Sequence, residues 1–256
     1  LIENDKVIGV ATNDLGVGKD GQKKDSYQPG VELHATHTLF AEGCRGSLTQ
    51  KLFDTFDLRK NCEPQTYGIG IKELWQVDPT KHHEGLITHS IGWPLPNDTY
   101  GGSFMYHMEN NLVSVGFVIG LDYTNPYLSP YDEFQRFKLH PKFRSTFDGA
   151  KRIAYGARAL NEGGYQSIPA VTFPGGAIIG CGAGFVNVPK IKGTHTAMKT
   201  GMLAAEAICE GNLNSYQEKL DTSWVAEELY KVRNIRPGFH GGLYKGLLNA
   251  AKETFF

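Results

Sequence analysis

The sequence predicts an α/β protein whose middle is interrupted by a mostly antiparallel insert of α+β type. In two places a strand leads through glycines into a helix, at about residues 31–56 and again at 178–209, which is the pattern of an α/β domain. Between them, from about residue 65 to 117, apolar and polar residues alternate in short runs separated by turns, which predicts antiparallel strands. One domain is therefore expected to be divided in sequence by another.

Composition and charge restrict the classes of function. The chain has 256 residues, of which 40% are hydrophobic, and this is enough for one large domain or two small ones. Its 26 basic and 27 acidic residues are interspersed, and the net charge of −1 supplies no field that would hold a polyanion. We therefore predict no nucleic-acid partner. The sequence also has no run of 18 apolar residues that would span a membrane as a helix.

The first residues and the cysteines add two expectations. The first ten residues lack the basic start and apolar run of a signal peptide and do not begin with Met, so we expect the natural N-terminus to lie upstream. The cysteines Cys44, Cys62, Cys181 and Cys209 show no C-x-x-C spacing. We therefore predict neither a disulfide framework nor a metal centre, and reduced thiols in an intracellular compartment.

The first part of the chain predicts a hairpin and a helix. Residues 7–12 and 31–40 read as strands joined by a charged loop. A Gly-x-Gly-x-x-Gly match at residues 16–21 lies in that loop and opens onto polar residues, so we interpret it as a hairpin loop and not a dinucleotide fingerprint. Apolar residues at helical spacing predict a helix over residues 47–56, after a glycine turn.

The insert is predicted to contain a sheet and a helix. The alternating runs are at residues 66–71, 86–91, 102–107 and 112–117. A helix with an aromatic face is predicted over residues 130–142. His34 and His37 point to opposite faces of a strand and are poor metal partners, and His82 with His83 is interpreted as a solvated pair in a polar loop.

The last part predicts the clearest helix of the chain, over residues 193–209, which follows a strand ending at 178–180. We expect this helix to have a face of small residues and methionines: Ala197, Met198, Gly201, Met202, Ala204 and Ala205. A second helix is predicted over residues 224–233. Pro237 and Gly238 then predict a break before a glycine-rich, mildly amphipathic stretch.

Two glycine-rich segments are candidate binding sites. The segment from Gly180 to Gly193 leads a strand end into a helix, and its exposed amides suit a flavin or a phosphate; a tight strand-to-helix connection is an equal alternative. Gly101 and Gly102 can offer amides to a carbonyl ligand, although composition alone favours a plain hairpin turn. No nucleophile–base pair is discernible, so we predict no catalytic side chain, as in redox proteins whose cofactor reacts.

Several longer motifs carry a resemblance to a known family. They are the runs at residues 41–46, 61–70, 92–95, 99–104, 120–123, 125–130, 152–164 and 188–196. Through them nearly the whole chain resembles the electron transfer flavoprotein–ubiquinone oxidoreductase family. The resemblance implies an FAD enzyme that passes electrons from reduced electron transfer flavoprotein, through FAD and a four-iron four-sulfur cluster, to ubiquinone. It also implies a monotopic protein on the matrix face of the mitochondrial inner membrane, or on a bacterial cytoplasmic membrane.

The resemblance also implies a fold and a division into domains. The expected fold is a glutathione-reductase-like FAD-binding fold, incomplete, with an inserted quinone-binding domain. The FAD domain would take residues 1–60 and 164–236, and the ubiquinone-binding domain residues 61–163. Residues 237–256 would begin a membrane-associated segment. A terminal helix that the end of the sequence cuts short is an equal alternative for those last residues.

The site residues follow motif by motif. Gly101 and Gly102 match the glycines that hydrogen-bond the quinone headgroup. The residues in motifs that line FAD are Gly43, Gly180, Gly184, Asn187, Gly193, Thr194 and Thr196. The family's FAD diphosphate fingerprint and its iron–sulfur domain have no match in this sequence, and the cysteines present do not replace the cluster ligands. We therefore expect a fragment of such an enzyme.

Two alternatives to this function are kept. One is a related flavoprotein, such as a geranylgeranyl reductase or an aromatic hydroxylase, that acts on a lipid or a ring. The other is an inactive fragment without cofactor.

Overall fold

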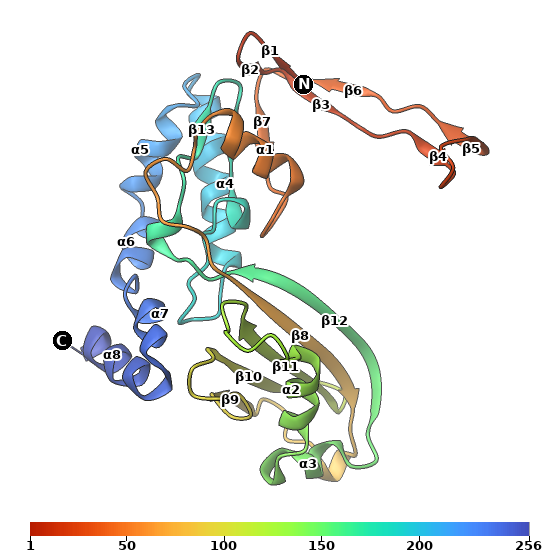
Figure 1. The fold of residues 1–256 in the computed structure, drawn as a ribbon, viewed down its shortest axis with the longest axis vertical. Coiled ribbons are helices and arrows are strands. Elements are labelled where there is room, and N and C mark those ends of the chain that lie inside the picture. The colour runs from red at the N-terminus through yellow and green to blue at the C-terminus, as the bar shows by residue number, and fades with distance from the viewer. Residues whose placement is uncertain (256) are drawn as a thin grey trace. The chain divides into compact units, whose positions relative to one another are not determined.

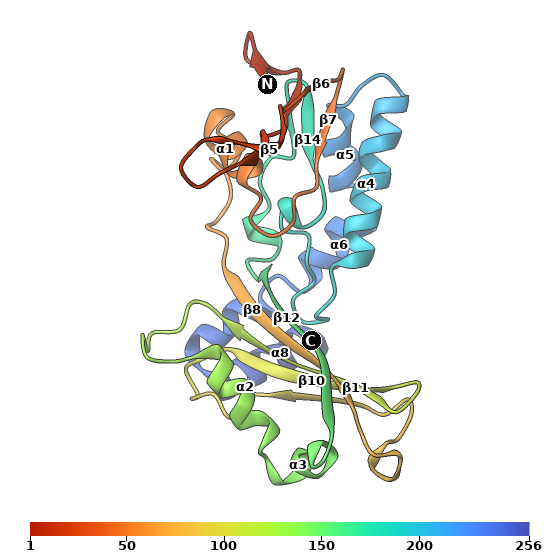
Figure 2. The ribbon, with the colours of Figure 1, turned by 90° about the vertical axis from the view of Figure 1, so that its right-hand side faces the viewer.

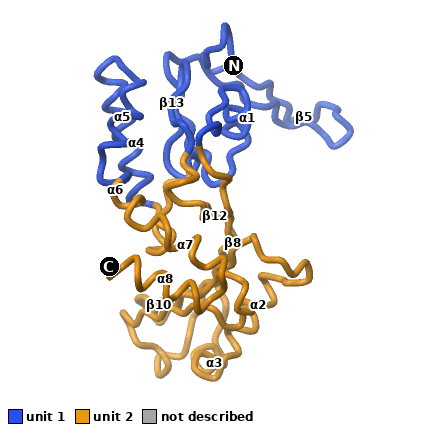
Figure 3. Tube along the Cα trace, turned by 60° about the vertical axis from the view of Figure 1, so that its left-hand side comes forward, with its two compact units in different colours: residues 1–61, 169–183, 194–226 blue, residues 62–168, 184–193, 227–256 orange. Residues whose placement is uncertain are grey.

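The computed structural model describes residues 1–255 and divides into two compact units (Figures 1 and 3). Unit 1 comprises residues 1–61, 169–183 and 194–226, and unit 2 comprises residues 62–168, 184–193 and 227–256. The region predicted as the second part of the FAD domain, 164–236, is thus divided between the two units. Residue 256 of the predicted membrane-associated segment lies outside the described residues.

The N-terminal strands of unit 1 are short. They are β1 (Ile2–Glu3), β2 (Lys6–Val7), β3 (Gly9–Ala11), β4 (Leu15–Val17), β5 (Lys23–Gln28) and β6 (Glu32–His34). β3 pairs antiparallel with β6, which confirms the predicted hairpin. The rejected glycine motif forms the turn between β4 and β5, where the Gly18 amide donates to the Gln22 carbonyl at 2.8 Å and the Gly21 amide to the Gly18 carbonyl at 3.0 Å. The interpretation as a hairpin loop is therefore confirmed.

The strand predicted over residues 31–40 is wrong as a single element. It forms β6 and, after a break at residues 35–37, β7 (Thr38–Phe40). β6 pairs with β3, whereas β7 pairs in parallel with β14 (Gly176–Ile178), which also pairs with β13 (Thr172–Phe173). The alternating residues predict extended backbone throughout, but they carry no information about a change of pairing partner.

Helices lie on both sides of the β7–β14 pair in unit 1 (Figure 2). The helices are α1 (Ser47–Thr55), α4 (Thr194–Cys209) and α5 (Ser215–Asp221), and α6 (Trp224–Lys231) begins in unit 1 and ends in unit 2. α4 confirms the predicted helix, but its face is different from the predicted one. Thr200, Leu203 and Ala207 are buried, whereas Met198 and Met202 are 65% and 54% exposed.

Unit 2 contains a five-stranded antiparallel sheet in the order β12-β8-β11-β10-β9 (Figure 1). Its strands are β8 (Tyr67–Gln76), β9 (Ile87–Ile91), β10 (Gly101–Met108), β11 (Leu112–Gly120) and β12 (Lys151–Asn161). The predicted antiparallel sheet is confirmed. β12 is the strand that the alternating pattern did not reveal.

One face of this sheet packs against α2 (Pro130–Lys138), and α3 (Pro141–Phe147) follows. Phe134 and Phe137 are buried in a cluster with residues such as Phe117. The helix predicted over residues 130–142 is therefore two helices. Pro141 explains the division, because proline disfavours helical backbone at the residue before it and is well suited to the first turn of a new helix.

The C-terminal part of unit 2 is helical: α7 (Ile235–Gly238), the 3-10 turn η4 (Phe239–Gly241) and α8 (Leu243–Phe255). The predicted break at Pro237 and Gly238 is confirmed at Gly238, where α7 ends. Pro237 itself lies in the first turn of α7, where its missing N–H costs no helical hydrogen bond. A second break falls at Gly242, whose φ is +92°. Among residues 1–255 no helix combines the length and apolarity needed to cross a bilayer.

Candidate functional site

In unit 1 the parallel strands β7 and β14 end at one edge, and a glycine follows each. The Ile179 amide donates to the Phe40 carbonyl at 3.0 Å, which holds the two strand ends together. Gly43 then has φ +88° and Gly180 φ +59°, conformations that favour glycine. The carboxyl edge of parallel strands is where ligands bind in α/β proteins. This edge is therefore the candidate cofactor site of unit 1.

The first turn of α1, the helix that follows Gly43, is capped by the carboxylate of Glu42. The Glu42 carboxylate accepts from the amides of Thr49 at 2.6 Å and Leu48 at 3.2 Å, and from the Thr49 hydroxyl at 2.7 Å. These bonds use the first-turn donors of α1, which are the groups that bind anions at helix N-termini. α1 is therefore an unsuitable place for a cofactor phosphate.

The turn after β14 packs against the start of α4. The 3-10 turn η3 (Gly180–Gly182) begins at Gly180, whose amide donates to the Thr200 hydroxyl at 3.1 Å. A Cβ on Gly180 would lie 3.3 Å from the Cβ of Ala197, so the backbone approaches α4 closely. Thr194 begins α4 and is exposed, and Thr196, two residues further on, is buried. The unit 1 residues predicted to line FAD thus belong to this one edge.

The other predicted FAD residues, Gly184, Asn187 and Gly193, belong to a loop of unit 2. Gly184 has φ +91°, and a Cβ there would lie 2.6 Å from Nε2 of Gln65. Asn187 is buried; its Nδ2 donates to the Glu228 carboxylate at 2.8 Å and its Oδ1 accepts from the Lys190 amide at 3.1 Å. Asn187 therefore shapes the loop that leads to Gly193.

Gly101 and Gly102 lie in β10, an interior strand of the sheet, and not in a hairpin turn. The Gly101 carbonyl accepts from the Gly92 amide at 3.0 Å. A Cβ on Gly101 would lie 2.5 Å from the Val118 carbonyl oxygen, and one on Gly102 would overlap the carbonyl oxygen of Ser90. Close approach of the neighbouring strands thus requires glycine at both positions, whatever the ligand.

A charged cluster with two buried members lies beside the start of β10. It consists of Glu162, which follows β12, Asp122, which follows β11, and Arg236 of α7. Arg236 donates from Nε to the Glu162 carboxylate at 3.2 Å and from Nη2 to both Asp122 oxygens at 2.9 Å. Its guanidinium also lies 4.3 Å from the ring centroid of Tyr100, the residue before Gly101.

Burial governs ionisation in this cluster. The side chain of Glu162 is 1% exposed, and burial raises the pKa of its carboxyl, with the Asp122 charge adding to the rise and Arg236 opposing it. Burial, together with the negative charge of Glu162, also raises the pKa of Tyr100 to about 12. Both pKa values are thus shifted upward, and burial is the largest cause of each shift.

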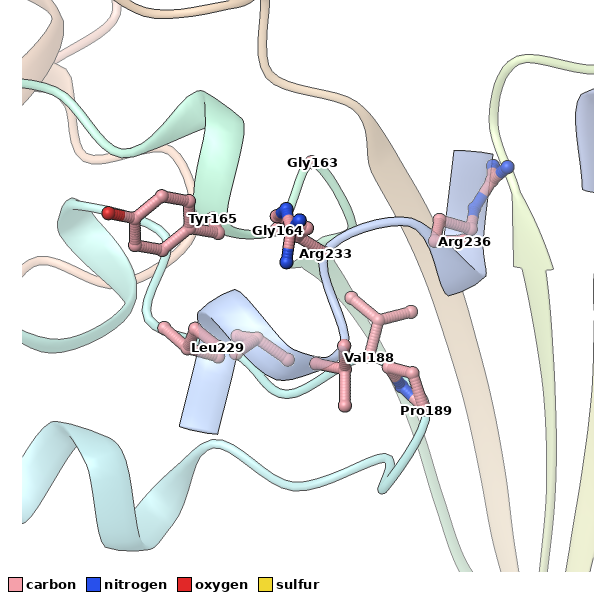
Figure 4. A pocket seen from close by; sticks show the side chains of 10 residues that line it. Gly163, Gly164, Tyr165, Val188, Pro189, Leu229, Arg233 and Arg236 are labelled. Carbon is pink, nitrogen blue, oxygen red and sulfur yellow. The ribbon is translucent and has the colours of Figure 1, made fainter. Parts of the chain in front are cut away.

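A small pocket of unit 2 lies next to the cluster (Figure 4). It combines glycine backbone and apolar side chains with two arginines. The lining residues are Gly163, Gly164, Tyr165, Val186, Val188, Pro189, Leu229, Val232, Arg233 and Arg236. Arg236 therefore lines the pocket and belongs to the charged cluster.

The interpretation of His82 and His83 as a solvated pair is confirmed for His83, which is exposed, and is wrong for His82, which is half-buried. The His82 ring centroid lies 5.2 Å from that of His107, and the His83 backbone amide donates to His107 Nδ1 at 3.1 Å. The approach follows from the sheet, since β10 carries His107 beside the loop that holds the pair. Burial lowers the pKa of His107, and its two neighbouring histidines add to this. Within residues 1–255 no group of three or more His, Cys, Asp or Glu side chains is arranged to hold a metal ion.

The sequence reasoning did not single out Glu162, Asp122 or Arg236. The available signal was local: Asp122 and Glu162 each come directly after a strand and close to a glycine, at Gly120 and Gly163. A charge at the end of a buried strand needs a partner. The identity of that partner, Arg236, depends on tertiary structure.

The fold is similar to that of two solved structures, one of which is a flavin-dependent enzyme. A solved structure of a geranylgeranyl bacteriochlorophyll reductase-like protein from Thermoplasma acidophilum is similar with a TM-score of 0.59 and 16% identity, over 99% of this chain and 55% of that one. The flavin-dependent brominase Bmp2 is similar with a TM-score of 0.60 and 17% identity, over 99% of this chain and 58% of that one.

By sequence, the chain belongs to the electron transfer flavoprotein–ubiquinone oxidoreductase family. Residues 67–160 match the family model described as ETF-QO, ubiquinone-binding. The mitochondrial electron transfer flavoprotein-ubiquinone oxidoreductase of Sus scrofa is 58% identical over 96% of this chain, which covers 43% of that protein. That of Arabidopsis thaliana is 55% identical over 98% of this chain, which covers 41% of it. The chain thus spans less than half the length of these relatives.

Proposed function

We propose that the full-length protein takes electrons from reduced electron transfer flavoprotein and passes them to ubiquinone. One observation carries this proposal: the ubiquinone-binding family match, residues 67–160, coincides with the five-stranded sheet of unit 2 from β8 to β12. The whole sheet of unit 2 thus corresponds to the part of the family described as ubiquinone-binding. We propose FAD and, in the full-length protein, a four-iron four-sulfur cluster as the electron carriers.

The residues proposed to hold FAD suit a large planar cofactor. Gly43 is half-buried at the carboxyl edge of β7, and Gly180 packs against α4 at that of β14. α4 directs the positive end of a sixteen-residue helix toward the same edge through Thr194 and Thr196. The other residues proposed to contact FAD are Gly184, Asn187 and Gly193, and the fold proposed for the full-length protein is glutathione-reductase-like. FAD, when bound, supplies the electron transfer.

The quinone is proposed to bind at Gly101 and Gly102. A backbone amide directed at a quinone oxygen stabilises the negative charge that develops there on reduction. Both residues lie within the ubiquinone-binding match. The chain therefore contributes orientation and electrostatics in this proposal, and no covalent catalyst.

Residues 237–256 are proposed to begin a surface that rests on one leaflet of the mitochondrial inner membrane, at its matrix face. α8 supports this with exposed apolar side chains, including Tyr244 at 69%, Leu248 at 74% and Phe255 at 78%. An amphipathic helix with such a face binds in the interfacial layer of a bilayer without spanning it.

The quinone site is tested by a pair of alanine variants in the full-length protein. Gly102→Ala places a methyl on the Ser90 carbonyl, whereas Gly70→Ala, in the same sheet, meets its nearest atom, Leu160 Cδ2, at 3.5 Å. We expect Gly102→Ala to lower ubiquinone reduction by about 100-fold, the lower end of the range for losing one positioned donor. FAD content and flavin reduction by electron transfer flavoprotein should be unchanged in both variants. Equal quinone turnover in the two variants would contradict the site.

The two alternative functions have direct tests. A reductase or hydroxylase accepts electrons from a nicotinamide, so flavin reduction by NADPH, with no response to electron transfer flavoprotein, would replace the proposed function. The absorbance spectrum of the purified chain tests the cofactor-free alternative. A flavin spectrum from this 256-residue chain would exclude that alternative, and a colourless product would support it.

A further inference from the structure

We propose that Glu162 supplies a proton to the quinone at the start of β10, and that Asp122 and Arg236 connect this carboxyl to water. The inference rests on the proposed function, and adds the proton path that quinone reduction requires. Its basis is the position, hydrogen bonding and exposure of the three charged side chains.

The cluster packs against the strand end that leads into Gly101. The Gly120 amide donates to the Tyr100 carbonyl at 2.9 Å, and Ile119 is the register partner of Gly101. A Cβ on Gly120 would lie 2.8 Å from Asp122 Oδ1, 2.9 Å from Arg236 Nη2 and 3.1 Å from Glu162 Oε2. All three charged groups therefore contact the backbone beside the proposed quinone position.

Glu162 shares its cation with a second carboxyl. Arg236 binds Asp122 through two hydrogen bonds and Glu162 through one longer bond of 3.2 Å. One guanidinium compensates one negative charge, so two ionised carboxylates beside it leave a negative charge buried. Taking up a proton at Glu162 removes that excess, and releasing it leaves a carboxylate that still contacts Arg236. This is the property of a group that exchanges protons.

The cluster reaches solvent on one side. The Asp122 side chain is 35% exposed, whereas those of Glu162 and Arg236 are 1% and 6% exposed. His240, whose side chain is 63% exposed, lies with Nε2 3.6 Å from Asp122 Oδ2. The groups that face Glu162 are thus Arg236, Asp122 and the Tyr100 ring, and water reaches this set at Asp122 and His240.

Ubiquinone takes up two electrons and two protons when it is reduced to ubiquinol. The electrons come from the flavin and cluster of the proposed function. Glu162 gives one proton from its carboxyl and becomes a carboxylate beside Arg236, and water restores that proton by way of Asp122. The second proton follows by a second passage along the same path.

The test uses Glu162→Gln in the full-length protein, since glutamine keeps the shape and an acceptor oxygen but cannot release a proton. We expect ubiquinone reduction to fall by about 100-fold, within the range for loss of a positioned acid, and its pH dependence to be lost. Flavin reduction by electron transfer flavoprotein and FAD content should be unchanged. Glu73→Gln is the matched buried control, and it should keep the pH profile of the wild type.

An unchanged rate and pH profile in Glu162→Gln would overturn the inference, as would the same loss in Glu73→Gln. A second readout does not depend on activity: infrared difference spectra should show a protonated carboxyl band that titrates in the wild type and is missing in Glu162→Gln. Absence of that band in the wild type overturns the role of Glu162 alone. A wild type that shows the band but reduces no ubiquinone overturns the proposed function and, with it, the destination of the proton.

Discussion

The sheet of unit 2 buries a glutamate at each end, and the two carboxyls are held in opposite ways. Glu73 of β8 is 2% exposed and accepts from Lys138 Nζ at 2.6 Å, Trp75 Nε1 at 2.8 Å and Arg152 at 3.1 Å. Glu162 is 1% exposed and accepts from Arg236 at 3.2 Å. The two side chains are equally buried, but Glu73 has more donors and shorter hydrogen bonds.

The contrast shows that hydrogen-bond donors and a close cation can outweigh the effect of burial on the pKa of a carboxyl. Burial raises the pKa of Glu73, but its hydrogen bonds from Lys138 and Trp75 and the Lys138 charge outweigh this effect and lower the pKa overall. At Glu162 burial prevails and the pKa is raised. One end of the sheet thus holds a fixed anion that ties α2 to β8, and the other holds a carboxyl able to exchange a proton.

The surroundings of the two carboxyls also differ, because glycines lie around Glu162 and larger side chains around Glu73. Glycines surround Glu162: a Cβ on Gly68 would overlap Glu162 Oε1, and Gly120 contacts the same carboxyl. Around Glu73 the space is filled by side chains, among them Trp75 and the fully buried Val115 opposite it. The glycines of this sheet therefore make room for the charged cluster.

The largest expected effect comes from Lys138→Met. It leaves the Glu73 carboxylate buried without its closest cation, so the free energy of unfolding should fall by about 3 kcal/mol, the lower end for breaking a buried pair. Hydrogen exchange of the β8 amides gives this value for unit 2 itself.

The control for that variant is Lys231→Met. Its ion pair with Glu227 is exposed, with side chains 68% and 63% accessible, and should contribute about 0.5 kcal/mol or less. Similar losses in the two variants would contradict a structural role for the Glu73 anion.

The second largest expected effect is a loss of stability at the end of the unit 2 sheet that holds Glu162 and its glycines. Gly120→Ala inserts a methyl among Asp122, Arg236 and Glu162 and should cost about 1–3 kcal/mol of unfolding free energy, as overpacking does. Gly156→Ala in β12 is the matched control, because a Cβ there meets nothing within 4 Å. Urea denaturation compares the two, and equal midpoints would show that the cluster tolerates displacement.

The smallest effect is a difference in pH dependence. The stabilisation by Glu73 is present above the ordinary carboxyl pKa and is lost as pH falls through its lowered pKa. The stabilisation by Glu162 is present below the ordinary pKa and is lost as pH rises through its raised pKa. The destabilisation by Glu73→Gln should therefore shrink in acid, and that by Glu162→Gln should shrink as pH rises, by about 1 kcal/mol for each unit of pKa shift. If the destabilisation by the two variants changed with pH in the same direction, the proposed difference between Glu73 and Glu162 would be contradicted.

Elements with an apolar pattern of their own were predictable from the sequence. The helix over residues 193–209 and the strands over 66–117 bury one face, and that face is visible as periodicity. β12 lacks such a face: residues 151–158 are exposed, and the strand exists through its pairing with β8. A strand defined by its partner leaves little trace in its own sequence.

The residues of the candidate sites also divide into those that local sequence predicts and those that tertiary structure brings together. Gly43 and Gly180 were recognisable because glycine at a turn is a local requirement. Arg236 and Glu162 are 74 residues apart, and only the packing of α7 near the end of β12 makes them partners. His82 and His107 likewise approach through the sheet and not through spacing.

The parallel pairing of β7 with β14 has a consequence for how the chain folds during its synthesis. Residues 38–40 leave the ribosome early, but their partner, residues 176–178, follows only after the whole five-stranded sheet has been made. The strands of that sheet pair only with one another, so the sheet can form as soon as it has been made. β7 stays without its partner strand β14 until residues 176–178 have been made. The interval is when this chain is most exposed to aggregation or chaperone capture, and slower translation between residues 161 and 176 would lengthen it.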